Sequence, residues 1–291
     1  MNLTRAKETA IKVAKYAGSQ IRRQLAAPKR IDSATQYDIK LELDVRSQRI
    51  IERQLRAAYP EIEFLGEEDA GRKTNAAYRW VVDPIDGTVN FAYGIPHACV
   101  SIALQGRNDA WEEQPRAHRG EQIENAQGRS STLRAYPDGY ATLLGIVYDP
   151  FCDELWTAIA GQTATLNGKR IRVSRRRKLA EAIVSIGLSK SRKHLEATLP
   201  LLNRLARRVR KIRIMGAGAL DLTYVATGRF DAYLERRIRL WDIAAAGLIL
   251  ECAGGEIWRE PVSGDYAFEM IASNGLLGKQ LGMPERDIRV S

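Results

Sequence analysis

Apolar residues recur at helical spacing in several segments of the chain. In the clearest of them, 3–25, they return every third or fourth position, and Pro28 follows, which cannot continue a helix. Asp44 stands at the N-cap position of a second predicted helix, 45–58, which Pro60 ends. The same spacing predicts further helices over 191–208, 218–228 and 241–252.

Runs rich in β-branched and aromatic residues predict strands between these helices. The segment 78–83 shows no alternation of apolar and polar residues, so we expect a strand that is buried on both faces. Asn167-Gly168 suits the tight turn of a hairpin within 166–174. The other predicted strands cover 61–66, 97–104, 141–148, 154–160, 182–188, 211–215, 230–235 and 268–272. Helices and strands therefore interleave, without the regular order of a doubly wound sheet.

The stretch 106–140 differs from the rest of the chain. It is polar and is interrupted by glycine and proline. We interpret it as an insertion, either a long surface loop or a partly disordered segment.

The stretch "WVVDPIDGTVNF", 80–91, places two carboxylates directly after an apolar strand. Pro84 forces an extended bend between them, which lets Asp83 and Asp86 converge with the carbonyl of Ile85 between them. Two carboxylates in one place repel each other unless a cation neutralises them. The sequence therefore predicts a positive partner for this pair.

Two more acidic clusters stand where one element meets another. Glu67, Glu68 and Asp69 follow a short strand, and Asp242 stands at the start of an apolar helix. Taken alone, the first cluster reads as a solvated turn and Asp242 as a helix N-cap. The pair of aspartates at 83 and 86 has no such simple structural reading.

Carboxylate oxygens are hard ligands, which select Mg²⁺ or a similar ion over zinc. Several carboxylates can hold a pair of such ions, the arrangement that clamps a phosphoryl group during displacement. Gly87 and Thr88 follow at a turn, where their backbone N–H groups suit a phosphate oxygen. The sequence therefore predicts a metal site that binds phosphate.

Three motifs together resemble the signatures of the inositol monophosphatase family of Mg²⁺-dependent, lithium-sensitive sugar phosphatases. They are "GEED" at 66–69, "DPIDGTVNF" at 83–91 and "WDIAAAGLILECAGG" at 241–255. The resemblance implies an α/β (α+β layered) fold, an alternating α-β-α-β-α sandwich. It implies one catalytic domain over 1–291 with two sub-lobes, roughly 1–180 and 181–291, and a homodimer.

The resemblance also implies roles for particular residues. The implied metal ligands are Glu67, Asp83, the carbonyl of Ile85, Asp86 and Asp242. In the implied catalytic set, Thr88 and Glu67 position and deprotonate the attacking water, and Asp44 lies near a third, weaker metal site. The implied substrate-binding set is Asp86, Gly87, Thr88, Gly216, Ala217, Gly218, Glu235 and Asp242. Two or three Mg²⁺ ions per active site are implied, which Mn²⁺ could replace.

Two departures from the family pattern concern the edges of this site. Lys40-Leu41 stands where the family commonly has Val-Thr, close to the third metal site. Arg236, Arg237 and Arg239 make the stretch after Glu235 basic. These arginines suit either a second negative group on the substrate or a solvated face.

The leading candidate reaction is hydrolysis of a sugar or cyclitol monophosphate, with myo-inositol monophosphate as the first candidate substrate. The same chemistry on histidinol phosphate, fructose 1,6-bisphosphate or 3′-phosphoadenosine 5′-phosphate is the alternative. Asn90 in "GTVNF" favours the inositol type.

Composition adds a hypothesis of another class. The 291 residues are 45% hydrophobic and carry a net charge of +10, which suits either an acidic substrate or a nucleic acid. Arg175-Arg176-Arg177 and Arg207-Arg208 are the candidate patches for nucleic acid, but aromatic residues do not interleave with them. No apolar run has the length of a membrane span, and the N-terminal segment lacks the apolar core of a secretory signal. Three scattered cysteines indicate reduced thiols in a cytoplasmic protein.

Overall fold

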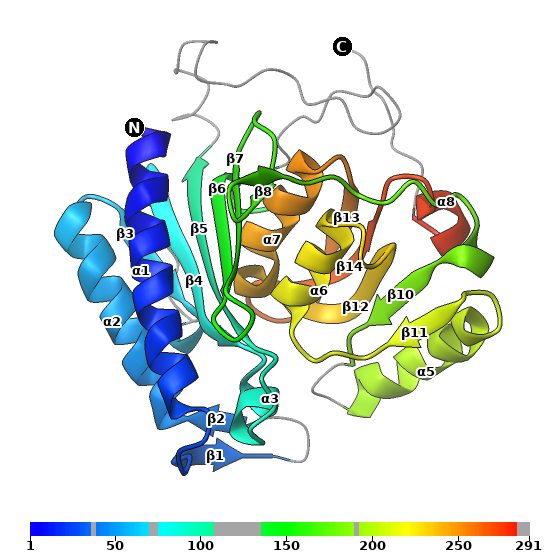
Figure 1. Ribbon diagram of the computed structural model, residues 1–291, viewed down its shortest axis with the longest axis horizontal. Helices are drawn as coiled ribbons and strands as arrows, with labels where there is room; N and C mark the ends of the chain where they lie inside the picture. Colours follow the sequence, from blue (N-terminus) through cyan, green and yellow to red (C-terminus); the bar gives the residue numbers. More distant parts are fainter. Residues whose placement is uncertain (36–38, 70–74, 108–134, 189–191, 284–291) are drawn as a thin grey trace.

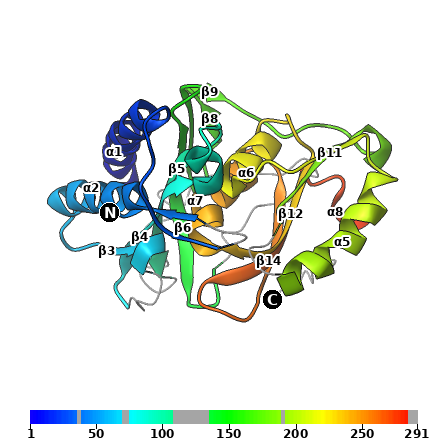
Figure 2. The same cartoon turned by 90° about the horizontal axis from the view of Figure 1, so that it is seen from below.

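Helices and sheets alternate in layers across the molecule (Figure 1). The computed structural model describes residues 1–35, 39–69, 75–107, 135–188 and 192–283. The layers of helix are, in order, α1 (Leu3–Gln24) with α2 (Glu42–Ala58), α6 (Gly218–Ala226) with α7 (Leu240–Cys252), and α5 (Arg192–Ala206) with α8 (Gly278–Leu281). A β-sheet lies on each side of the central pair, as Figure 2 shows from below. This order confirms the predicted α-β-α-β-α sandwich.

The larger sheet has seven strands, and their order in space follows their order in the chain. They are β3 (Glu63–Gly66), β4 (Tyr78–Asp86), β5 (Cys99–Arg107), β6 (Tyr140–Asp149), β7 (Glu154–Ile159), β8 (Thr165–Leu166) and β9 (Lys169–Arg170). β3 and β4 are parallel, and the remaining pairs are antiparallel. Because α1 packs on one face of β5 and β6 and α7 on the other, both strands are buried almost throughout.

The smaller sheet has five strands in the order β11, β10, β12, β14, β13. Their bounds are β10 (Ile183–Ile186), β11 (Lys211–Arg213), β12 (Ala232–Arg239), β13 (Glu256–Pro261) and β14 (Ala267–Ser273). β10 pairs in parallel with β11 and β12, whereas β14 is antiparallel to β12 and β13. One face of this sheet meets α6 and α7, and the other meets α5 and α8.

Five short elements complete the described part of the fold. β1 (Ile31–Ala34) and β2 (Ile39–Leu41) form an antiparallel hairpin, which lies beside α3 (Thr88–Ala92). The 3-10 turn η1 (Glu67–Asp69) follows β3 directly, and a second such turn, η3 (Leu179–Glu181), precedes β10. Among the described helices, none is both long and apolar enough to cross a membrane.

Several sequence predictions need correction. α2 begins at Glu42, so Asp44 is the third residue of the helix and not its N-cap. β12 continues to Arg239, well past the predicted end at 235. The β1–β2 hairpin and β13 were not predicted, because β1 is exposed along its whole length and β13 ends in exposed residues, so neither shows a clear apolar period.

The predicted insertion is shorter than 106–140 at both ends. Gly106 and Arg107 belong to β5, and Tyr140 belongs to β6. Tyr136 is buried against the ring of Phe268, at 5.7 Å between ring centroids. The prediction for 108–134 lies outside the described residues.

Candidate functional site

A bulge in β4 brings two of the predicted acids to the end of that strand. Asp83 pairs with Ser101 and Asp86 with Cys99, so two residues of β4 stand opposite one of β5. Pro84 is one of the two, and a bulge tolerates its missing N–H group. The Ile85 N–H donates to Asp83 Oδ1 at 2.9 Å. The strand therefore continues through the bend that the sequence predicted.

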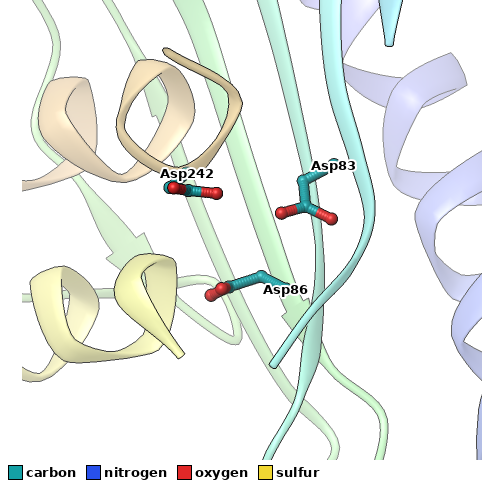
Figure 3. Close-up of side chains that lie close together, drawn as sticks. All are labelled: Asp83, Asp86 and Asp242. Atoms are coloured by element: carbon teal, nitrogen blue, oxygen red, sulfur yellow. The ribbon is translucent and has the colours of Figure 1, made fainter. Parts of the chain in front are cut away.

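Asp242 joins this pair from the first turn of α7. One ligand oxygen from each of Asp83, Asp86 and Asp242 lies within 4.8 Å of the others, and Figure 3 shows the three carboxylates facing a common space. Asp242 is the third residue of its helix and not the N-cap, and its Oδ2 accepts a hydrogen bond from the Arg239 N–H at 2.9 Å. The structure thus brings together acids from two distant motifs.

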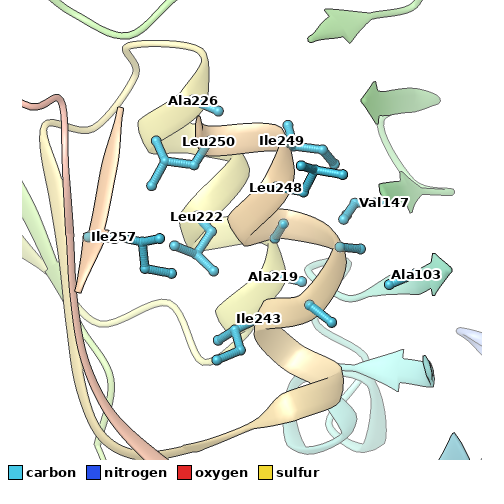
Figure 4. Close-up of a cluster of buried hydrophobic side chains, with 14 of the residues drawn as sticks. Ala103, Val147, Ala219, Leu222, Ala226, Ile243, Leu248, Ile249, Leu250 and Ile257 are labelled. Carbon is cyan, nitrogen blue, oxygen red and sulfur yellow. The ribbon is translucent and has the colours of Figure 1, made fainter. Parts of the chain in front are cut away.

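The helix that carries Asp242 is fixed by its surroundings. Nearly every side chain of α7 is buried, as expected for a helix that is apolar all round and lies between two sheets. Figure 4 shows Ile243, Leu248 and Ile249 packed among side chains of α6 and the strands. The Ser101 hydroxyl also donates to the carbonyl of Trp241 at 3.0 Å, which ties β5 to the first turn of α7. Rigid neighbours on both sides therefore position Asp242.

Asp86 also occupies the N-terminus of α6. Its carboxylate oxygens accept hydrogen bonds from the N–H groups of Gly218 at 3.1 Å and Ala219 at 2.8 Å. The thiol of Cys99 lies 3.6 Å from Asp86 Oδ2. Burial raises the pKa of Asp86 to about 6, although the hydrogen bonds from Ala219, Gly218 and Cys99 oppose that rise. The N–H groups at the start of α6 thus partly stabilise the ionised form of the Asp86 carboxylate.

Asp83 lies in a more negative environment. Burial raises its pKa well above the usual range, and the charge of Glu67 is the next largest cause, followed by those of Asp86 and Asp242. The charges that act most strongly on Asp83 are therefore all negative. A buried set of carboxylates in this state takes up protons or binds a cation.

The chemistry of the donor set fits a divalent cation with a preference for oxygen. The group consists of carboxylates from three aspartates, and hard oxygen donors suit Mg²⁺ or Mn²⁺ better than zinc. Glu67 stands in η1, outside this group of three, yet near enough for its charge to act on both Asp83 and Asp86. Of the predicted carboxylate ligands, Asp83, Asp86 and Asp242 therefore lie together, and Glu67 lies next to them.

Thr88 and Ile85 are in direct contact. The Thr88 hydroxyl donates to the Ile85 carbonyl oxygen at 2.9 Å. Gly87 precedes α3 with φ = 92°, a left-handed conformation that favours glycine. A Cβ at this position would lie 2.8 Å from the carbonyl oxygen of His97, so the backbone passes too closely for a side chain.

Asn90 connects α3 to the predicted pocket segment 216–218. Its Nδ2 donates to the carbonyl oxygens of His97 at 3.0 Å and Met215 at 2.8 Å. The sequence indicated Asn90 only as a marker of substrate type. The structure shows that it joins the loop before α6 to the loop after α3, with Ala217 beside Gly87 and Gly216 beside the Asn90 side chain.

Asp44 is not among the three clustered aspartates. It is buried, and its Oδ2 accepts a hydrogen bond from the Leu41 N–H at 2.9 Å at the start of α2. Close to it, Lys40 Nζ pairs with Glu68 at 2.6 Å, and the Gln48 side chain accepts from the Glu68 N–H. Asp44 thus helps to cap α2, next to the turn that carries the acidic motif.

Glu235 is linked to the segment 216–218 through Tyr233, whose hydroxyl lies near Gly218. It is half-buried on β12, and the Tyr233 hydroxyl donates a hydrogen bond to its Oε2. Sequence reasoning missed Tyr233 and also missed Asp221, a buried acid on α6. The two-residue spacing of Tyr233 and Glu235 on a predicted strand was the available signal, because such residues share a face.

Comparison with known proteins identifies the family. The model of the inositol monophosphatase family matches residues 2–110 and 136–266. The chain belongs to the inositol monophosphatase family. The match leaves out 111–135, which falls within the polar stretch that the sequence sets apart.

Alignments with individual relatives cover most of this chain. Inositol monophosphatase 2 of Solanum lycopersicum is 34% identical over 256 residues, which cover 85% of this chain and 84% of that protein. A protein of Xylella fastidiosa named Nus factor SuhB is 33% identical over 250 residues, 85% of this chain and 79% of its own length. The solved structure of inositol monophosphatase from Anabaena has a TM-score of 0.74 at 28% identity, with 97% of this chain and 95% of that chain covered.

Family membership confirms the predicted enzyme class, a phosphatase that acts on phosphoric monoesters. It favours this class over the nucleic-acid-binding alternative. The domain boundaries, the homodimer, the lithium sensitivity and the cytoplasmic location stay predictions.

Proposed function

We propose that the chain hydrolyses the phosphate monoester of a sugar or cyclitol with the help of Mg²⁺, and that myo-inositol monophosphate is its substrate. The convergence of Asp83, Asp86 and Asp242 carries this proposal. A solvated acidic surface would keep such groups apart, whereas here burial raises the pKa of Asp83 and Asp86, and the negative charge of Glu67 raises both further. A bound cation offsets that repulsion.

Glu67, Asp83, the Ile85 carbonyl, Asp86 and Asp242 would hold the ions. Once bound, Mg²⁺ supplies positive charge that stabilises the negative charge of the phosphoryl group in the transition state. Mn²⁺ has the same ligand preference and could take its place.

The residues of the chain orient the other reactants. The Thr88 hydroxyl donates a hydrogen bond to the carbonyl oxygen of Ile85, so the lone pairs of its own oxygen can accept a hydrogen bond from the attacking water. Glu67, close to Asp83 and Asp86, takes the proton of that water as a general base. We expect the phosphate to accept hydrogen bonds from the backbone N–H groups of Gly87 and Thr88, and Glu235 to accept hydrogen bonds from substrate hydroxyls.

Phosphate release from purified protein tests the proposal. The substrates are myo-inositol 1-phosphate, histidinol phosphate, fructose 1,6-bisphosphate and 3′-phosphoadenosine 5′-phosphate, each with Mg²⁺ and with a chelator. We expect metal-dependent release with the highest kcat/KM for the inositol ester. A higher kcat/KM for one of the other three esters would identify that ester, and not inositol phosphate, as the preferred substrate. Equal phosphate release with Mg²⁺ and with the chelator would contradict the proposed role of the metal.

The Asp83→Asn variant tests the site itself. Because it removes one negative charge from the cluster, we expect turnover to fall by at least about 100-fold in Mg²⁺. Glu68→Gln is the matched control: it removes an adjacent carboxylate that pairs with Lys40, and we expect activity within about twofold of the wild type. Equal activity of both variants would contradict the assignment of Asp83.

A further inference from the structure

We propose that Tyr233 is a positioning residue, which fixes the carboxylate of Glu235 and so gives the enzyme its preference for hydroxyl-rich phosphate esters. This inference rests on the proposed function, in which Glu235 receives the hydroxyls of the substrate.

Tyr233 and Glu235 lie on one face of β12. They are two residues apart in a strand, so both side chains point away from the face that Leu234 presents to the α5 side. The Tyr233 hydroxyl donates to Oε2 of Glu235. Tyr233 is 1% exposed whereas Glu235 is half-buried. The pair therefore has a fixed end in the core and a carboxylate nearer to solvent.

The hydroxyl end of this pair borders the acidic cluster. A Cβ at Gly218 would lie 3.2 Å from the Tyr233 hydroxyl oxygen and 3.6 Å from Cβ of Asp242. The N–H group of the same Gly218 donates a hydrogen bond to Oδ1 of Asp86. One backbone residue thus separates the Tyr233 hydroxyl, and with it the Glu235 oxygen that accepts its hydrogen bond, from two of the three clustered aspartates.

Glu235 is confined on a second side by Gly187. A Cβ at this glycine would lie 2.0 Å from Oε2 of Glu235, so the carboxylate occupies the space that any side chain would need. The Gly187 N–H donates to the Leu234 carbonyl at 2.9 Å, which fixes the loop against β12. The carboxylate is held between a phenol and a backbone before substrate arrives. Such preorganisation avoids the entropic cost of ordering a flexible glutamate on binding.

The charges around Tyr233 keep it a hydrogen-bond donor. Burial raises its pKa well above the usual range, and the negative charges of Glu235, Asp221 and Asp86 raise it further. The phenol therefore stays protonated while Glu235 accepts. A purely structural explanation, in which Glu235 serves only to satisfy a buried phenol, predicts no dependence on the kind of substrate.

Steady-state kinetics of Tyr233→Phe distinguishes the two explanations. The probes are myo-inositol 1-phosphate and 4-nitrophenyl phosphate, whose leaving group has no hydroxyl besides the one formed. We expect KM for the inositol ester to rise about fivefold to tenfold, the effect of one lost hydrogen bond, with both constants for the nitrophenyl ester unchanged. Tyr140→Phe is the control, since it removes a buried phenol that donates to Ala76 at 2.6 Å.

Two more variants keep the test decisive. Gly187→Ala displaces the Glu235 carboxylate from its other side, and we expect the same selective rise in KM. In the Glu235→Ala background, Tyr233→Phe should add nothing, because the group that it positions is absent. An equal rise in KM for both esters, or effects on KM that add in the double variant, would overturn the positioning role of Tyr233.

The wild-type result separates this inference from the proposed function. A wild-type enzyme that shows no preference for the inositol ester contradicts the proposed function. A wild-type preference that persists unchanged in Tyr233→Phe contradicts only the role of Tyr233.

Discussion

A carboxylate that is buried beside other carboxylates either keeps a proton or binds a cation. The structure offers a candidate for each case. Asp83 and Asp86 face Asp242 in a group that could hold an ion. Asp221 lies outside that group, and burial raises its pKa well above the usual range, although the Ser185 hydroxyl opposes the rise. The same hydroxyl donates to the carbonyl oxygen of Arg213 at 3.3 Å, and burial, the largest cause, favours the protonated form of Asp221.

The stability of the protein should therefore depend on pH through Asp221. An unfolded aspartate loses its proton near about pH 4. The folded protein holds the proton to higher pH, so the free energy of unfolding falls as pH rises from there through the folded-state pKa. Asn cannot ionise. We expect urea unfolding to show Asp221→Asn gaining stability relative to the wild type as pH rises from about 5 to about 9.

A second buried aspartate provides the control for this experiment. Asp231 is fully buried, but it accepts hydrogen bonds from Arg176 at 2.9 Å and from the Ile183 N–H at 2.8 Å. Asp231→Asn should lose about 1–3 kcal/mol of unfolding free energy, because it removes a charged acceptor that has partners. If Asp221→Asn behaves like Asp231→Asn, the carboxyl of Asp221 is ionised and has a partner.

The residues of the site differ in how far the sequence could predict them. Asp83 and Asp86 could be placed together because Pro84 lies between them in an otherwise apolar strand. Tyr233 could not be placed beside Gly218, since that contact depends on how α6 packs on β12. Asp44 was assigned to the wrong cap position because an aspartate caps a helix from its third residue as well as from the N-cap.

At the scale of elements, the predicted bounds were accurate for helices with a long apolar period and inaccurate for exposed strands. α1 and α7 begin and end within a residue or two of their predictions because burial selects their side chains. β12 ran longer than predicted because its second half contains three arginines, which carry no strand signal. A bulge at Arg237 lies in that half, where Arg236 pairs with Glu269 and Ile238 with Phe268.

This bulge should make glycine more favourable than alanine at position 237. Arg237 has φ = 70°, a left-handed conformation that costs a residue with a Cβ roughly 1 kcal/mol. Arg237→Gly and Arg237→Ala both remove the guanidinium, and only the first relieves the backbone. We expect chemical denaturation to show the glycine variant more stable than the alanine variant by about 1 kcal/mol, the reverse of the order in a regular strand. The opposite order would show that the left-handed conformation costs nothing here.

At the scale of the whole molecule, the acidic cluster depends on the meeting of layers. Asp83 and Asp86 come from the seven-stranded sheet, and Asp242 comes from the central helix α7, beside the N-terminus of α6. The central helices pack on both sheets. Charge at this junction therefore opposes the packing of the layers when no cation is present, and a bound cation should favour it.

Asp83→Asn should consequently reverse its rank against the wild type when metal is added. In chelator the variant lacks one of the mutually repelling groups, so we expect a higher Tm than that of the wild type. In Mg²⁺ at about 100 times its Kd the wild type gains about 2.7 kcal/mol, and the variant, with a weakened site, gains much less. Thermal melts of both proteins in each buffer, with Glu68→Gln as a control that follows the wild type, provide the measurement. A wild type that is the more stable protein in both buffers would mean that the carboxylates do not repel one another in the folded chain, and equal gains in Mg²⁺ would mean that the ion binds elsewhere.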